Sequence, residues 1–473
     1  RPAAFEPYER LVELYRRLNR ADELPQVLAR QADANRKNPA PRWLAAAEGM
    51  GHDPDAADAV IRKLLGGLKT PDEARVLVAA YHNSNRPKEL LDLLDRTAKA
   101  GRPAGFDDPD MKPDAEPDPP PAEAVERVRL LYAAVKAFTP KAGFTRVLVK
   151  QLADDARSQT DRHPDTLELV SGLAVRDGLA PTVIDSLWVF ARRKSSLRVT
   201  WLLLTHLSSQ RRWADVIDAA DELKVMRRNK QQFIYYGIAS QAAVAFAELG
   251  REREALAKLT DIGGGFYADE QRIRVLNLLG KHADALKAVE KVLDKDRPIG
   301  RDLRSFHLQQ ADTLNLLKRF AESEAVLRQL LGDDPDDVLV LNNLGYNLAD
   351  QGRKLDEAEV LIRRAIELDK FERTKRGDPE AESGGYQDSL GWVLFRRGKL
   401  KEARELLEQA VASTESAPDG VVWDHLGDVA FRQGDTKRAA AAWKRAAELF
   451  KDSHLGRQNG RLDEVKRKIE LAK

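Results

Sequence analysis

Residues able to carry chemistry are few and widely spaced in this 473-residue sequence. Its eight histidines form no H-E-x-x-H array and no pair within helical reach, so zinc-hydrolase chemistry lacks ligands. There is no cysteine, which excludes disulfides, thiolate nucleophiles and zinc sites with sulfur ligands. No serine lies in a G-x-S-x-G elbow. We therefore expect no enzyme, no catalytic residue, no metal and no cofactor.

Two isolated features each have a functional and a structural interpretation. The triple glycine Gly263-Gly264-Gly265 could cradle a phosphate, but neither a lysine nor a strand accompanies it, which favours an inter-repeat turn. His425 could be a ligand, but a solvated or groove-facing side chain on a helix is the ordinary explanation.

One basic stretch offers a different kind of chemistry. Residues 192–230 hold ten Lys/Arg against four acids, with Trp201 and Trp213 interleaved. Such a stripe could bind nucleic-acid phosphates or an anionic surface. A solvated convex face is favoured instead, because 78 Lys/Arg against 76 Asp/Glu leave the chain at only +2. Nucleic acid is therefore not the expected partner.

The composition indicates the elements that must position any site. Charged residues make up 33% of the chain and aromatics only 6%, and much of the apolar content is alanine. This favours helices with narrow apolar stripes over sheets. No apolar run approaches the ~18 residues of a membrane span. The sequence opens at Arg1 without an initiator methionine or signal segment, so we expect that its true N-terminus has been removed or left out. The compartment stays open between cytoplasm and periplasm.

Pairs of short amphipathic runs recur along the chain. In residues 421–450, one apolar face carries Leu426 and Gly427, a turn follows at Gly434, and a second face carries Ala439 and Trp443. Small residues at the crossing would let two helices approach closely. The same frame recurs around Gly391, Gly345 and Ala311, and the last two are 34 residues apart.

This spacing resembles the tetratricopeptide repeat of bacterial proteins. The runs LNNLGYNLAD (341–350), YQDSLGWVLFRRGKLKEA (386–403) and VVWDHLGDVAFRQGD (421–435) carry the resemblance. It implies an all-α protein: a right-handed α-solenoid of stacked antiparallel helix pairs, with a separate N-terminal helical arm. The predicted organisation is a degenerate repeat arm (1–100), a Pro/Asp-rich linker (101–122), irregular helical repeats (123–232), a repeat array (233–450) and a capping helix (451–473).

Two departures from the repeat frame are predicted. Residues 370–384 add about eleven residues, which we expect to form a charged loop at one edge of the solenoid. Residues 462–472 have a polar helical pattern that could cap the open end of the stack.

The resemblance also implies a concave groove that binds a peptide or helix of another protein. Carried over by position, the first copy offers Leu308, Asp312 and Asn315. The predicted groove residues of the next three copies are Asn342, Tyr346, Asp350, Asp388, Trp392, Arg396, Asp424, Asp428 and Arg432.

Aromatic residues at the groove positions have alternative placements. We expect Tyr346 and Trp392 to be exposed in the groove, whereas Phe395 and Phe431 are expected to pack between repeats. The Lys/Asn clamp with which some relatives hold a C-terminal carboxylate is absent. An acidic and aromatic groove suits a partner segment with basic and apolar residues.

The favoured function is a non-catalytic scaffold or adaptor that recruits a protein partner in the groove. One alternative is the targeting or regulatory part of a larger enzyme whose catalytic domain lies outside this chain. Another is nucleic-acid or anionic-surface binding through residues 192–230. Some relatives with such C-terminal repeats are envelope lipoproteins that present substrates to a protease. The sequence leaves the oligomeric state open.

Overall fold

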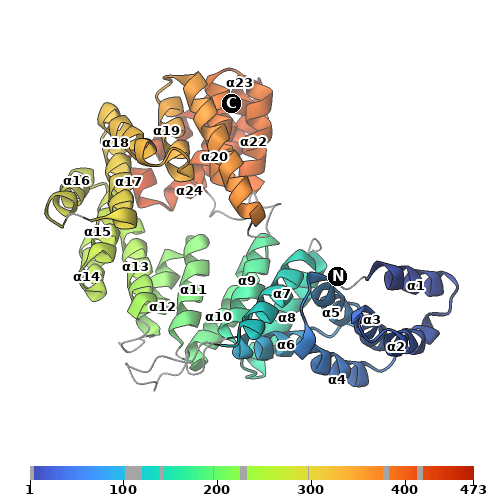
Figure 1. The fold of residues 1–473 in the computed structure, drawn as a ribbon. Helices are drawn as coiled ribbons and strands as arrows, with labels where there is room; N and C mark the ends of the chain where they lie inside the picture. The colour runs from blue at the N-terminus through green and yellow to red at the C-terminus, as the bar shows by residue number, and fades with distance from the viewer. Residues whose placement is uncertain are drawn as a thin grey trace. The chain divides into compact units, whose positions relative to one another are not determined.

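Every described element in the computed structural model of the chain is helical (Figure 1). The structure describes residues 5–101, 120–138, 142–194, 196–223, 232–296, 298–375, 383–412 and 419–472. The chain divides into two compact units, and we call Arg1–Leu203 with Arg227–Lys230 unit 1 and Leu204–Met226 with Gln231–Lys473 unit 2. The boundary falls inside the helix α11 (Leu197–Ser209).

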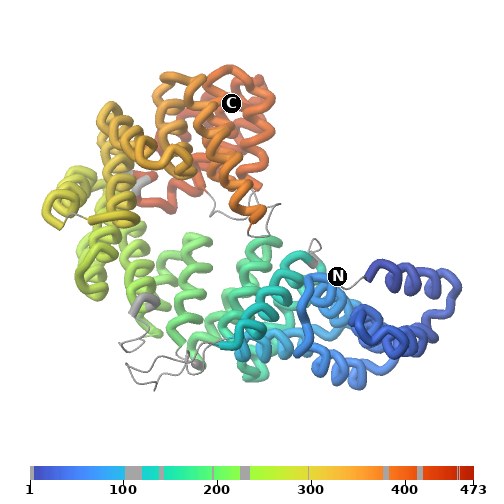
Figure 2. Tube along the Cα trace, viewed as in Figure 1, coloured from blue at the N-terminus to red at the C-terminus, as the bar shows by residue number. Residues whose placement is uncertain are grey.

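Unit 1 is a series of helices (Figure 2). Several helices begin with proline, whose fixed φ suits the first helical turn. Its helices are α1 (Glu6–Arg17), α2 (Leu24–Ala34), α3 (Ala40–Gly49), α4 (Pro54–Leu64), α5 (Pro71–Asn83), α6 (Pro87–Ala100), α7 (Ala122–Phe138), α8 (Ala142–Arg157), α9 (Pro164–Arg176) and α10 (Ala180–Lys194).

Unit 2 contains the predicted repeat pairs and two further helices at its C-terminal end. The pairs are α13 (Gln232–Glu248) with α14 (Glu252–Leu259), α15 (Phe266–Leu278) with α16 (His282–Lys291), α17 (Gly300–Leu316) with α18 (Phe320–Asp333), α19 (Val338–Asp350) with α20 (Leu355–Lys375), α21 (Gly384–Arg396) with α22 (Leu400–Ala412), and α23 (Gly420–Arg432) with α24 (Thr436–Lys451). Before them lies α12 (Trp213–Glu222), and after them α25 (His454–Gln458) and α26 (Arg461–Leu471).

Glycine allows the close crossing of helices in the last three pairs. A Cβ built on Gly345 would lie 2.6 Å from Ile362, and one on Gly391 would lie 2.7 Å from Leu407. A Cβ on Gly427 would overlap the Trp443 indole. Leu344, Ile362, Leu390 and Leu407 share one buried cluster, so the predicted alternation of small and large residues is what packs these hairpins.

The hairpin turns use a left-handed backbone that favours glycine. Gly250, Gly280, Gly352, Gly398 and Gly434 have φ between 69° and 82°. After the last of these, the Asp435 amide donates to the Ala430 carbonyl at 3.0 Å, the bond that closes a Schellman-type helix end. The helix pairs therefore turn back by local chemistry that a short sequence segment contains.

The predicted charged loop at residues 370–384 is wrong in its first part. Helix α20 continues to Lys375 instead, because its sequence is rich in helix formers and Arg373 pairs with Asp369 at 2.7 Å one turn earlier. Residues 376–382 lie outside the described residues. So does almost all of the predicted linker, since residues 102–119 are not described.

Candidate partner-binding site

Three rings from consecutive first helices of the pairs meet at the predicted groove. The Trp392 indole of α21 stacks on the His425 imidazole of α23, with centroids 3.9 Å apart and planes inclined by 13°. The Tyr346 ring of α19 lies 6.3 Å from the same imidazole. We call the surface formed by α17, α19, α21 and α23 at the predicted groove positions the first-helix face.

His425 is paired inside this face rather than solvated. Its side chain is buried, and its Nδ1 lies 2.8 Å from an Asp388 carboxylate oxygen. Burial acts to lower the pKa of His425, but the Asp388 carboxylate outweighs burial and raises that pKa above its ordinary value. The expectation of a solvated histidine is therefore wrong, because Trp392 covers the ring and Asp388 satisfies its nitrogen.

Helix α26 occupies the end of the first-helix face at α23. The Lys468 ammonium lies 2.8 Å from Asp424 and 2.9 Å from Asp428, two of the predicted groove residues. Trp443 also donates its indole N–H to Asp428 at 3.1 Å. Burial, with the neighbouring Asp424 carboxylate, raises the pKa of Asp428 despite this ammonium. These two acids are thus engaged within the chain.

Two predicted groove arginines hold neighbouring repeats together. The Arg396 guanidinium donates to the Asp350 carbonyl at 3.0 Å and lies 5.7 Å from the Trp392 ring centroid. The Arg432 guanidinium lies 5.3 Å from the Phe395 ring of the preceding repeat. Both guanidinium groups therefore make cation–π contacts, Arg396 within its own repeat and Arg432 with the preceding repeat. Asp350 itself is exposed.

Unsatisfied polar atoms gather on three consecutive first helices. Within the described part of unit 2, the buried side-chain atoms without a hydrogen-bond partner are Gln309 Oε1, Asn342 Oδ1 and Trp392 Nε1. They belong to α17, α19 and α21, respectively. Such atoms are rare in native proteins and each one needs a physical explanation.

Asp312 on α17 has an unusual electrostatic environment. Its side chain is exposed, yet burial by surrounding protein raises its pKa to about 6. Access to solvent combined with dense protein around the carboxyl group is typical of a recessed surface.

Aromatic exposure differs from the sequence expectations in two places. Trp392, expected to be exposed, is only 8% exposed, because the rings of His425 and Phe395 both stack with its indole. Phe431, expected to be packed, is 39% exposed, although its ring lies 5.4 Å from that of Trp443. Phe395 is buried as expected, and Tyr346 is half-buried.

Sequence reasoning missed Gln309 and Lys468. Gln309 lies next to the predicted positions on α17, and a count of polar side chains facing the groove could have found it. Lys468 gave no local signal, because its partners Asp424 and Asp428 precede it by 44 and 40 residues.

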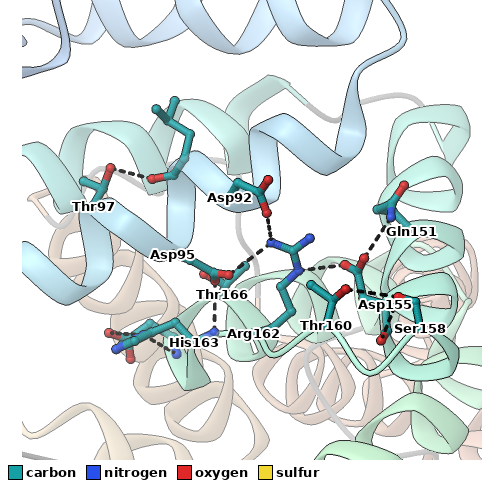
Figure 3. Close-up of polar contacts among 12 residues, drawn as sticks. Asp92, Asp95, Thr97, Gln151, Asp155, Ser158, Thr160, Arg162, His163 and Thr166 are labelled. Carbon is teal, nitrogen blue, oxygen red and sulfur yellow. Dashed lines mark hydrogen bonds and ion pairs between the residues drawn. The ribbon is translucent and has the colours of Figure 1, made fainter. Parts of the chain in front are cut away.

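Unit 1 contains a buried charge network that has a structural role (Figure 3). The Arg162 side chain is 1% exposed and donates to Asp155 at 2.7 Å, to Asp92 at 2.6 Å and to Asp95 at 3.1 Å. These acids come from α6 and α8, so one guanidinium joins two helices to the segment preceding α9. Asp95 also accepts the His163 amide at 3.0 Å, which fixes the start of α9.

Some residues of the other candidate features make contacts within the chain, and residues 195 and 224–230 of the basic stretch lie outside the described residues. Gly263 and Gly265 have positive φ in the turn before α15, as the turn interpretation predicts. In the basic stretch, Arg193 donates to the Ala156 carbonyl at 2.7 Å and Arg192 stacks on Trp188. Among the described residues, no group of three or more His, Cys, Asp or Glu side chains could hold a metal ion.

A hollow of about 510 Å³ lies between α2, α3 and α4 in unit 1. Its walls are mainly small and apolar, including Ala29, Ala45 and Ala56, with Arg42 and Asp53 at the polar positions. Across the described part of the chain, no helix combines the length and hydropathy that a membrane span requires.

Comparison with known proteins agrees with the hairpin geometry. Tetratricopeptide repeat family models match residues 279–338, 308–373 and 385–417. The C-terminal half of the chain therefore contains tetratricopeptide repeats, within residues 279–373 and 385–417. These repeats support a general role as a protein-interaction scaffold with protein partners.

Three similar proteins match this chain in sequence or in structure. A TPR repeat-containing protein of Pseudomonas aeruginosa is 37% identical over 91 residues, which span 19% of this chain and 14% of that protein. A tetratricopeptide repeat protein from Parabacteroides merdae is 15% identical, with a TM-score of 0.32, over 65% of this chain and 98% of that one. The Cut9–Hcn1 hetero-tetramer structure of APC/C is 13% identical, with a TM-score of 0.38, over 98% and 88%.

Proposed function

We propose that unit 2 is a non-catalytic scaffold that binds a segment of another protein on the first-helix face of α17, α19 and α21. Of the nine predicted groove residues, Asn342, Tyr346 and Trp392 would contact the partner. The other six would shape the face from within, through the contacts with His425, Lys468 and the neighbouring repeats described above.

The observation that carries this proposal is the set of three unsatisfied atoms on consecutive first helices. Gln309 and Asn342 offer acceptors, and Trp392 offers a donor. A buried polar atom without a partner costs about 1–3 kcal/mol. A peptide backbone presents both N–H donors and C=O acceptors, so a bound segment could satisfy all three atoms.

Asp312 supports a preference for a basic segment. No hydrogen bond or ion pair of its carboxylate is present in the described residues, and the surrounding protein raises its pKa to about 6. A lysine or arginine of a partner would stabilise the charged carboxylate and lower that pKa. Tyr346 is half-buried on α19, the first helix of the next pair, and would provide apolar contact.

The test uses two substitutions that each remove an unsatisfied atom. Asn342→Leu nearly keeps the size of the side chain and should raise the thermal stability of the free protein, because it removes a desolvated group that has no partner. Trp392→Phe also deletes part of a buried indole that stacks on His425, so it tests binding and not stability. The same substitutions should weaken binding of peptides selected on the wild-type protein from a displayed peptide library, by about tenfold for a lost bond of ~1.4 kcal/mol.

Lys444→Ala is the matched control, because Lys444 is exposed on α24. It should change neither stability nor peptide binding. Stabilised variants that bind the selected peptides as tightly as the wild type would show that water alone satisfies these atoms, and the proposal would fail.

A further inference from the structure

The C-terminal end of unit 2 returns to the beginning of the same unit. The Trp213 indole at the start of α12 donates to the Asp452 carbonyl at 3.3 Å, across 239 residues of sequence. The His454 amide donates to the Glu248 carboxylate at 3.2 Å, and Arg457 donates to the Glu248 carbonyl at 3.4 Å. The helix α25 contacts α13, and Figure 1 shows red ribbon of the C-terminal part beside the helices there. We call residues 452–457 the clasp.

The clasp lies against Gly250, and a larger residue at this position would displace the His454 ring. The imidazole of His454 lies 2.8 Å from where a Cβ of Gly250 would be. Gly250 also has φ +74°, a conformation that favours glycine. The equivalent turn glycine Gly434 has a similar φ of +82° but open space around it. The contact with His454 therefore distinguishes Gly250 from an otherwise similar turn.

The segment after the clasp is anchored more firmly than the clasp itself. Val465 of α26 is fully buried in a cluster with Trp443 and Phe450, and Lys468 pairs with α23. The described side chains and backbone of the clasp make three hydrogen bonds of 3.2–3.4 Å and one ring contact with α12, α13 and the turn at Gly250. Between the two parts, Gly460 has a left-handed backbone. The clasp could thus release while α26 stays attached.

Release would leave α26 attached to α23 and α24 and free the two ends of the array. Arg461 at the start of α26 acts electrostatically on both Tyr346 and His425, so α26 begins close to the first-helix face. Because the clasp links α12 and α13 to the segment that follows α24, it limits how far the first and last pairs can separate. In this proposal, a larger separation of the pairs widens the first-helix face.

We infer that the clasp is a reversible closure of unit 2 and that its release admits a partner segment to the first-helix face. This inference rests on the proposed function, but its test needs no partner. The class of device is an intramolecular contact that limits access, and its parts are His454, Arg457, Glu248, Gly250 and Trp213.

The first experiment measures the distance between the two ends of unit 2. Arg253→Cys on α14 and Lys444→Cys on α24 place dyes at exposed positions of a chain that has no other cysteine. Gly250→Ala should lengthen and broaden the dye–dye distance by displacing His454. Gly434→Ala carries a similar backbone strain and should leave the distance unchanged.

The second experiment measures access to the face. Asp312→Cys provides a thiol at the recessed position, and its modification by a maleimide with a bulky polyethylene glycol chain reports opening. Gly250→Ala should speed modification by up to about tenfold, the effect of losing one or two hydrogen bonds of the clasp. His454→Ala removes the ring contact but keeps the amide that donates to Glu248, so a smaller increase is expected. His454→Ala leaves Gly250 unchanged, so backbone strain at position 250 cannot explain its effect.

The outcomes separate this inference from the proposed function. Unchanged distances and modification rates in folded Gly250→Ala and His454→Ala proteins would overturn the closure. Faster modification without any effect of Asn342→Leu on peptide binding would instead overturn the proposed function and leave the closure standing. Faster modification together with tighter peptide binding by His454→Ala would support both.

Discussion

At the scale of single residues, His425 shows how burial and charge compete on the first-helix face. We expect an NMR titration to give His425 a pKa above the ordinary 6.5, because Asp388 stabilises the imidazolium more than burial destabilises it. Since the folded pKa is raised, the pair stabilises the fold fully below the unfolded pKa. That contribution is lost as pH rises through the folded pKa.

Asp388→Asn is the control for this titration. It keeps the size of the side chain but removes the charge, so burial dominates and the pKa of His425 should fall below 6.5. A titration midpoint that does not move would show that Asp388 does not determine the charge of His425.

Arg162 carries the second residue-scale prediction. Arg162→Met should lower the free energy of opening α8 and α9 by about 3–5 kcal/mol, because it leaves Asp155 and Asp95 buried without a countercharge. Hydrogen–deuterium exchange of these helices measures that opening locally.

Asp92→Asn tests whether burial sets the size of the effect. The Asp92 side chain is 34% exposed, so water can replace part of its pairing, and a loss below about 1 kcal/mol is expected. Equal losses in the two variants would contradict the view that buried, unpaired acids cause the destabilisation.

At the scale of helices, the glycine crossings can be tested by adding a single methyl group. Gly427→Ala should destabilise the last repeat by about 1–3 kcal/mol, because its Cβ would overlap the Trp443 indole. Thermal unfolding and hydrogen exchange of α23 and α24 measure this loss.

Gly172→Ala is the opposite case. Gly172 lies inside α9 and has nothing within 4 Å of an added Cβ. Alanine is the better helix former, so a gain of about 0.5–1 kcal/mol is expected. If both substitutions destabilised the protein alike, space at the crossing would not be the reason that glycine occurs at position 427.

The repeat frame predicts the hairpins well because their chemistry is local. The turn at Gly434 and the crossing of Gly427 with Trp443 involve residues close in sequence. The same frame fails for Trp392, because it does not show which later segment covers a face. It also fails for α20, where an insertion continues the helix rather than forming a loop.

At the scale of the whole molecule, composition predicts the all-helical class, but contacts between distant segments stay hidden. Lys468 reaches Asp424 across 44 residues, and His454 reaches Glu248 across 206. No periodicity of a 34-residue repeat encodes such pairings. The unit boundary inside α11 likewise has no proline or glycine cluster to mark it.

The contact between Trp213 and Asp452 has a consequence for how this array can change. Open repeat arrays gain or lose a hairpin at their ends with little effect on the rest, because each repeat contacts only its neighbours. In unit 2 the first and last segments also contact each other, so one added or deleted hairpin would shift every residue between them and separate Glu248 from His454. An array that keeps the clasp therefore keeps its number of hairpins.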